Sequence, residues 1–278
     1  MIRIGCHLSS SGGFLAMGKE AVSINANTFQ CFLRNPRGAA AKPLNLADVE
    51  AYNQYAADND IKFLLGHAPY TANPCAAQPH LRDLARDMVA DDLARLAHIP
   101  GSLYTLHPGN HVGQGVDAGI KLIADMLNDV LQAKQPTMVL LETMAGKGTE
   151  IGGAFEELKA IIRKVKLKKQ VGVCFDTCHV FDAGYDIVNN LDGVLEEFDK
   201  TVGLSKIKAI HLNDSKNLMG SRVDRHEMIG EGRIGLEAFV RIVNHPALKD
   251  IPFYLETPTD LAGYAKEIAT LRGLAGAL

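Results

Sequence analysis

Short apolar runs rich in β-branched residues recur along this chain at intervals of about 25 to 45 residues. There are eight, at 2–6, 28–32, 62–65, 103–106, 138–141, 171–175, 207–210 and 253–255. Their near-continuous hydrophobicity is typical of strands that are buried on both faces of a parallel sheet. Segments with apolar residues at every third or fourth position, clearest at 81–97 and 120–131, separate the runs and predict amphipathic helices.

Eight strands alternating with helices favour a single (β/α)8 TIM barrel over the whole chain, residues 1–278. The length of 278 residues would also fit two domains, but no linker rich in Pro, Gly or Ser divides the chain. A doubly wound open sheet is the competing architecture. The absence of a GxGxxG motif after the first strand argues against it.

Charge and cysteine content restrict the cellular context. Lys and Arg total 29 against 32 Asp and Glu, a net charge of −3, so the global charge does not attract nucleic acid. No apolar run is long enough to span a membrane, and the N-terminus lacks the pattern of a secretory signal. The five Cys include no CxxC pair, which indicates reduced thiols. We therefore expect a cytoplasmic protein without a membrane partner.

Residues of metal-ligand type end six successive predicted strands. They are His67, His107, Glu142, Asp176, His211 and Glu256. Barrel active sites lie at the C-terminal ends of the strands, so these six side chains are expected to share one site. Three more join them: His179 lies three positions after Asp176, and Asp224 and His226 lie two apart. In extended chain, that last spacing would point both side chains to one side.

Imidazoles beside carboxylates are the ligand set of zinc and neighbouring transition metals, whereas magnesium prefers oxygen ligands alone. Nine ligands exceed the needs of one ion and suggest two or three. The cations would also provide the local attraction for phosphate that the net charge lacks. A sugar isomerase or epimerase with one or two ions is an alternative.

Several blocks of the sequence are specific enough to indicate a family. In order they are GCHLSSSGG (5–13), NTFQCFLRNPR (27–37), GHAPYTANP (66–74), LHPGNHVGQG (106–115), LLETMAGKGTEIG (140–152), GVCFDTCHVFDAGYD (172–186), AIHLNDSKNLMGSRVDRHEMIGEG (209–232) and YLETP (254–258). The chain resembles endonuclease IV, the metal-dependent apurinic/apyrimidinic endonucleases also called deoxyribonuclease IV. It departs from the family, which often has a Trp shortly after the NPR segment, because it contains none.

The resemblance implies a xylose isomerase-like TIM barrel with three zinc ions, in which Glu142 bridges two. By residue, it assigns the first ion to His67, His107 and Glu142, the second to Glu142, Asp176, His211 and Glu256, and the third to His179, Asp224 and His226. It implies hydrolysis of the phosphodiester 5′ to an abasic site, leaving a 3′-hydroxyl and a 5′-deoxyribose phosphate, and removal of blocked 3′ ends. Glu142 and Glu256 are the catalytic candidates, and Glu256 would orient or deprotonate the attacking water. A catalytically silent protein that binds DNA lesions is the alternative from a different functional class.

Two long loops, 34–46 and 213–233, are expected to border the metal site and to contact double-stranded DNA. The DNA-binding candidates are Arg37, Tyr70, Lys216, Arg222 and Arg225. The resemblance also places Arg37 and Tyr70 where side chains penetrate the duplex. The basic run 163–169 joins a helix to the next strand and should lie on the opposite face. His7 ends the first run, with a role near phosphate and a structural hydrogen bond both open. We expect a monomer.

Overall fold

A computed structural model describes residues 2–276, so residues 1, 277 and 278 at the ends of the predicted domain lie outside it. Eight strands pair in parallel in the order β1-β10-β7-β6-β5-β4-β3-β2. Their bounds are β1 Ile4–Cys6, β2 Gln30–Phe32, β3 Leu65–His67, β4 Leu103–Leu106, β5 Met138–Glu142, β6 Val171–Asp176, β7 Ile207–His211 and β10 Phe253–Leu255. Two short strands, β8 (Asp214–Ser215) and β9 (His226–Glu227), form a separate antiparallel pair.

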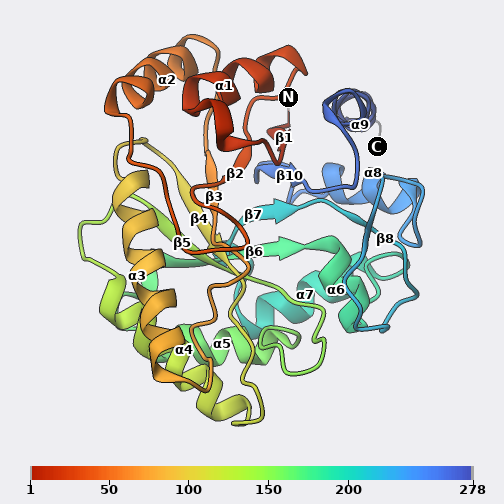
Figure 1. The fold of residues 1–278 in the computed structure, drawn as a ribbon. Coiled ribbons are helices and arrows are strands. Elements are labelled where there is room, and N and C mark those ends of the chain that lie inside the picture. The colour runs from red at the N-terminus through yellow and green to blue at the C-terminus, as the bar shows by residue number, and fades with distance from the viewer. Residues whose placement is uncertain (1, 277–278) are drawn as a thin grey trace.

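Helices surround the strands (Figure 1). They are α1 Phe14–Ser23, α2 Leu46–Asp58, α3 Pro79–Leu96, α4 Val116–Val130, α5 Phe155–Lys164, α6 Thr177–Ala183, α7 Leu191–Thr201, α8 Leu236–Asn244 and α9 Leu261–Leu274, with short 3-10 turns η1 Ser10–Gly12, η2 Lys168–Gln170 and η3 Leu204–Lys206. None of the helices within residues 2–276 combines the length and the apolar character that a membrane crossing requires.

Contacts between the first two strands close the barrel. His7 and Gln30 form a parallel bridge, and the Leu8 amide donates to the Gln30 carbonyl at 2.8 Å. The Asn27 amide donates to the Ile4 carbonyl at 3.1 Å on the same seam. With every neighbouring pair of barrel strands parallel, this closure confirms the predicted (β/α)8 TIM barrel and excludes the doubly wound sheet.

The core consists of two layers, one inside the barrel and one between the strands and the helices. Two layers are expected because the strands are apolar on both faces and each helix has one apolar face. Inside the barrel, Leu65, Leu140, Cys174, Ala209 and Tyr254 form a buried cluster. Between strands and helices, the predicted helix around 120–131 buries Ile120, Ile123, Ala124 and Leu127 as one face of α4. Each of these Ile and Leu side chains contributes about 1.5–3 kcal/mol by leaving water. This burial fixes the strands whose ends carry the candidate site.

The third strand begins later than predicted. The apolar run 62–65 suggested a strand there, but the strand covers Leu65–His67. Phe63 has a φ of 59°, a left-handed conformation that interrupts extended backbone. The shift makes His67 the last residue of β3. The basic run 163–169 precedes β6, so it lies at the N-terminal ends of the strands as predicted.

Candidate metal centre

The six predicted strand-end residues lie together at the C-terminal ends of the barrel strands. His67, Glu142, Asp176 and His211 are the last residues of β3, β5, β6 and β7, while His107 and Glu256 directly follow β4 and β10. All are buried except His107 and Glu256, which are partly buried. Barrel closure therefore converts positions spread over most of the chain into one cluster.

Glu142 lies at the centre of this cluster. Its Oε2 is 3.4 Å from His67 Nε2 and 3.7 Å from His107 Nε2, and its Oε1 is 3.1 Å from His211 Nδ1. The donor atoms of His67, His107 and Glu142 all lie within 4.8 Å of one another, close enough to share one ion. A carboxylate that faces imidazoles through both oxygens has the geometry of a bridging ligand.

A second group lies on the other side of Glu142. Glu142, Asp176, His211 and Glu256 each offer a donor atom within 4.8 Å of the others. His211 Nδ1 is 3.6 Å from Asp176 Oδ2 and 3.4 Å from Glu256 Oε2. Three carboxylates therefore face one ring nitrogen, an arrangement that a divalent cation would stabilise.

The third predicted set, His179, Asp224 and His226, is also brought together. Asp224 Oδ1 lies 3.1 Å from His179 Nε2 and 3.5 Å from His226 Nε2, and Asp176 groups with both histidines. The prediction that Asp224 is extended is wrong, because its φ is 61°. This left-handed residue, two positions before the first residue of the short strand β9, turns the carboxylate toward His179.

Backbone carbonyls orient three of the histidines. His67 Nδ1 contacts the Ala68 carbonyl at 2.6 Å, His179 Nδ1 the Thr143 carbonyl at 2.8 Å, and His226 Nδ1 the Glu256 carbonyl at 3.2 Å. A carbonyl can only accept, so in each ring Nδ1 carries a proton, and in the neutral form of the ring Nε2 keeps its lone pair. Imidazoles fixed in this way present a ready ligand atom.

Sequence reasoning missed two buried residues that hold the candidate ligands in place. Asn213 donates through Nδ2 to Asp176 Oδ2 at 2.8 Å, and its Oδ1 accepts from the Glu256 amide at 2.8 Å. Asp182 accepts from the Asp224 amide at 2.9 Å. Both follow ligand positions closely, Asn213 two residues after His211 and Asp182 three after His179. Polar residues at that spacing are the signal that would have identified them.

The electrostatics of the cluster fit bound cations. Burial alone would raise the pKa of Glu142, but the surrounding imidazoles hold it well below its usual value. Burial likewise opposes ionisation of Asp224, yet its hydrogen bond to His179 lowers its pKa to about 2. Within the described residues, Glu142 Oε2 and His226 Nε2 are buried without hydrogen-bond partners. Unpartnered buried oxygen and nitrogen atoms within groups of possible ligands are the arrangement that metal ions would satisfy.

The cysteines near the cluster are poor thiolate candidates. Burial raises the pKa of Cys174 to about 11 and raises that of Cys178 further above its usual value. Cys178 lies within ligand distance of Asp224 and His226, but both thiols are fully buried. Burial keeps the uncharged form, as expected of inert core thiols.

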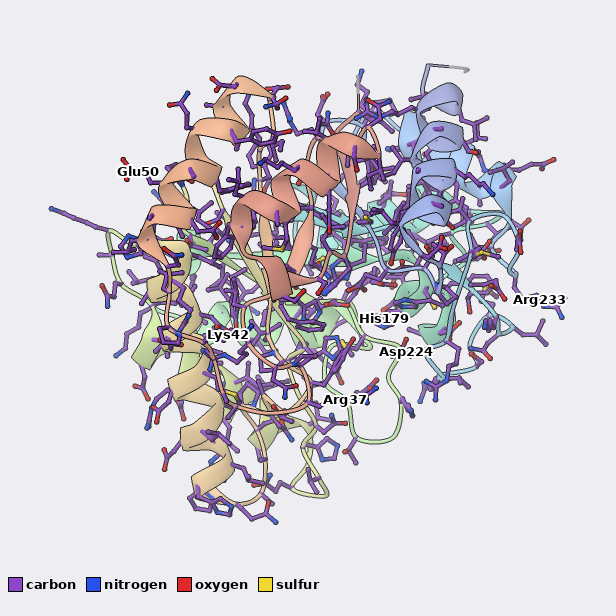
Figure 2. The ribbon with its side chains drawn as sticks, turned by 45° about the horizontal axis from the view of Figure 1, so that its top comes forward. Arg37, Lys42, Glu50, His179, Asp224 and Arg233 are labelled. Carbon is purple, nitrogen blue, oxygen red and sulfur yellow. The ribbon has the colours of Figure 1, made fainter. Side chains whose placement is uncertain are left out.

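Two DNA-binding candidates lie beside the histidines. Tyr70 is 63% exposed, and its ring centre is 5.2 Å from that of Phe32 and 6.2 Å from that of His107. Its amide donates to the Pro36 carbonyl at 3.0 Å, which joins its loop to the loop of Arg37. Arg37 is exposed on that loop (Figure 2). Its backbone amide donates to Asn35 Oδ1 at 3.0 Å, while within residues 2–276 its guanidinium has no hydrogen-bonded or ion-paired partner.

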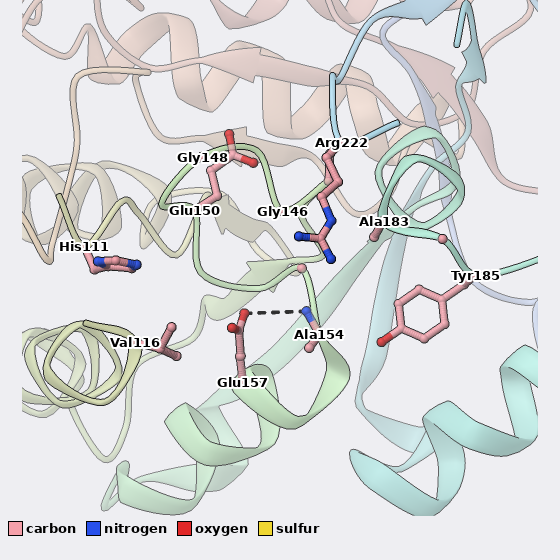
Figure 3. A pocket seen from close by; sticks show the side chains of 13 residues that line it. His111, Val116, Gly146, Gly148, Glu150, Ala154, Glu157, Ala183, Tyr185 and Arg222 are labelled. Atoms are coloured by element: carbon pink, nitrogen blue, oxygen red, sulfur yellow. Dashed lines mark hydrogen bonds between the residues drawn. The ribbon is translucent and has the colours of Figure 1, made fainter. Parts of the chain in front are cut away.

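The remaining basic candidates lie on the loop between β8 and β9. Arg225 donates to the Asp224 carbonyl at 2.8 Å, and Lys216 lies 3.8 Å from a Glu227 oxygen. Arg222 points into a pocket of about 410 Å³ whose wall includes Glu150 and Tyr185 (Figure 3). All three basic residues are exposed or partly exposed. The loop thus places positive charge next to the candidate ligands Asp224 and His226.

Known proteins match almost the whole chain. Residues 19–274 match the family described as Xylose isomerase-like TIM barrel. "Probable endonuclease 4" of Alkaliphilus oremlandii is 60% identical over 98% of this chain and 97% of its own, and that of Clostridium beijerinckii is 58% identical over 99% of each. The crystal structure of endonuclease IV from Thermus thermophilus superposes with a TM-score of 0.88 at 32% identity over 98% of both chains. The chain therefore belongs to the endonuclease IV family of xylose isomerase-like TIM barrels.

Proposed function

We propose that this protein is a DNA repair endonuclease that hydrolyses the phosphodiester bond 5′ to an abasic site in double-stranded DNA. The products would be a 3′-hydroxyl and a 5′-deoxyribose phosphate, and blocked 3′ ends would be further substrates. The observation that carries the proposal is the convergence of nine metal-ligand side chains at the C-terminal end of a barrel whose relatives are named as endonucleases. Their grouping around Glu142 fits phosphodiester hydrolysis assisted by several metal ions.

We propose three zinc ions as the cofactor. The donors are imidazole nitrogens and carboxylate oxygens, which favour zinc and its neighbours over magnesium. The first ion would take His67, His107 and Glu142, and the second Glu142, Asp176, His211 and Glu256. His179, Asp224 and His226 would hold the third, with Asp176 nearby. Three divalent ions more than neutralise the four carboxylates, so the site would attract phosphate despite the acidic net charge.

Such ions supply Lewis-acid activation of water and neutralisation of charge on the reacting phosphate. The protein's part is to hold the ligands in place and to manage the proton. Glu142 positions two ligand groups, as its contacts to His67 and His211 indicate. Glu256 is partly exposed, and imidazoles that include His211 keep its pKa well below its usual value although burial opposes this. An ionised carboxylate at the mouth is suited to orient or deprotonate the attacking water.

DNA would bind across the same face. Arg37 and Tyr70 are proposed to enter the duplex at the lesion, since an exposed aromatic ring can stack on bases for about 1–3 kcal/mol. A guanidinium both stacks and contacts phosphate. Lys216, Arg222 and Arg225 would contact the phosphate backbone next to the third ligand group. Drawing out the nucleotide costs least where the base is already missing, which favours abasic substrates.

Cleavage of an abasic duplex oligonucleotide by the purified protein tests this function. We expect a single nick 5′ to the lesion, loss of activity with a strong chelator, and recovery with zinc. Glu142→Gln should abolish cleavage, whereas Glu156→Gln, on the exposed face of α5, should not. Binding without any nick would instead indicate a lesion-binding protein. Turnover of a ketose with one or two ions, and no nick, would indicate a sugar isomerase.

A further inference from the structure

Gln30 is a buried polar residue at the closing seam of the barrel, and no ligand assignment includes it. It is the first residue of β2 and is fully buried. Its backbone carbonyl accepts from the Leu8 amide at 2.8 Å, so the main chain is already fixed by barrel closure. The side chain points to the barrel mouth, where its amide contacts three residues.

The contacts of the Gln30 amide define which end is oxygen and which is nitrogen. One of the two terminal atoms of the amide lies 2.5 Å from Glu256 Oε1. An ionised carboxylate can only accept a hydrogen bond, so this terminal atom must be the nitrogen, Nε2. The second Nε2 proton points to His7 Nδ1 at 2.9 Å. The amide oxygen then lies 2.6 Å from His211 Nε2. All three contacts of the amide are therefore satisfied in one orientation.

This orientation determines the tautomer of His211. An amide oxygen can only accept, so His211 Nε2 must carry the proton and the neutral ring keeps its lone pair on Nδ1. Nδ1 is the atom that faces the carboxylates of Glu142, Asp176 and Glu256, at 3.1, 3.6 and 3.4 Å. His211 therefore presents Nδ1 as its possible ligand atom. His67, His179 and His226 present Nε2 instead, because their Nδ1 atoms face backbone carbonyls.

We infer that Gln30 is a positioning residue that fixes His211 with Nδ1 toward the second ligand group and holds the Glu256 carboxylate beside it. This inference rests on the metal centre proposed above. Glu142 and Asp176 are not contacted by the amide, so the effect is confined to two ligands of one group. His7 has a structural role in this arrangement, because its Nδ1 accepts the remaining amide proton.

A sequence signal for this role existed. A glutamine within the otherwise apolar run TFQCF lies two residues from Thr28 and from Phe32, on the same face of the strand. Gln30 lies inside the run and is neither His, Asp nor Glu, so it does not share the pattern of the nine candidate ligands. What Gln30 contacts, however, depends on residues 181 and 226 positions later in the chain.

Although burial opposes its charged form, neighbouring anionic groups raise the pKa of His211 in metal-free protein. The tautomer of the neutral ring, observed in metal-free protein at alkaline pH, therefore gives a test that needs no activity. Long-range ¹H–¹⁵N correlation spectra report which ring nitrogen is protonated, and a His211→Gln variant assigns the signal. We expect a proton on Nε2 in the natural protein and a mixture of tautomers in Gln30→Met. An unchanged tautomer in Gln30→Met would overturn the inference.

Metal retention provides the second readout. Competition with a chromogenic chelator should show one ion held roughly 10- to 100-fold more weakly in Gln30→Met, the range typical for loss of a group that orients a ligand. The other ions should be retained as before. Gln135→Met removes an amide hydrogen bond to the Thr137 carbonyl at the far end of the barrel and should change neither readout.

The two readouts separate this inference from the proposed function. If the natural protein bound no ions, the metal centre would be refuted while the tautomer comparison would still decide the role of Gln30. Equal retention of every ion by Gln30→Met and the natural protein would overturn the positioning role alone. Folding of each variant is checked by circular dichroism before either measurement.

Discussion

A buried ion pair anchors the loop that carries Arg37, and removing it should have a large effect on stability. The Arg34 side chain is 4% exposed, and its Nε and Nη2 donate to Asp92 Oδ1 at 3.0 and 2.8 Å. Its Nη1 donates to the Ala39 carbonyl at 2.7 Å within the same loop. Asp92 lies on α3, is fully buried, and accepts a further bond from the Tyr104 hydroxyl at 2.9 Å.

Arg34→Met would leave the Asp92 carboxylate with Tyr104 as its remaining side-chain partner. Loss of one member of a buried pair costs about 3–5 kcal/mol, because the remaining charge stays desolvated. Burial already raises the pKa of Asp92, and Arg34 counteracts this. Without Arg34 the folded-state pKa rises further above the unfolded value. The folded variant then binds a proton more tightly, so its loss of stability is full at about pH 8 and smaller at about pH 5.

Urea unfolding of the metal-loaded protein, followed by circular dichroism, measures this change. The double variant Arg34→Met/Asp92→Asn should recover more than half of the loss, because no buried charge remains. Arg86→Met is the matched control. Arg86 lies on α3, the helix of Asp92, and pairs with the exposed Asp83, so its loss should not change the unfolding midpoint. A loss below about 1 kcal/mol that is equal at both pH values would refute the reasoning.

Four further outcomes are expected at the site. Elemental analysis of active protein should give about three zinc-like ions per chain, and one ion or none would contradict the ligand assignment. In a nicking assay, Glu142→Gln should remove more activity than His226→Gln, since Glu142 faces two ligand groups; the reverse ranking would exclude a bridging role. Tyr70→Ala and Arg37→Ala should keep full metal content and stability but weaken binding to abasic duplex and reduce its selectivity over intact duplex, as gel-shift titrations would show. Neutralising the three lysines within 166–169 should leave the salt dependence of DNA binding unchanged, and a shallower slope would move the DNA surface to that face.

The strand pattern and the site composition could be predicted from local sequence. Eight apolar runs separated by amphipathic helices specify the barrel, because the periodicity of side-chain burial is a local property. The strand ends, including Glu142 and Asp176, identified the candidate ligands because the barrel fold places every strand C-terminus on one face. Motif resemblance added the grouping of these ligands into three sets, and the donor-atom distances are compatible with it.

Only the tertiary structure decided how those side chains are held. Phe63 and Asp224 both have a left-handed backbone conformation. The apolar run around Phe63 and the two-residue spacing of Asp224 and His226 had each suggested extended chain instead. The tautomer of His211 depends on Gln30, and the burial of Arg34 depends on Asp92, each pair separated by tens to hundreds of residues. A hydrogen bond requires two atoms within about 3 Å, and for distant segments closure of the barrel sets that separation. The sequence by itself therefore determined which groups meet at the barrel mouth, while the folded chain determined which atoms face each other.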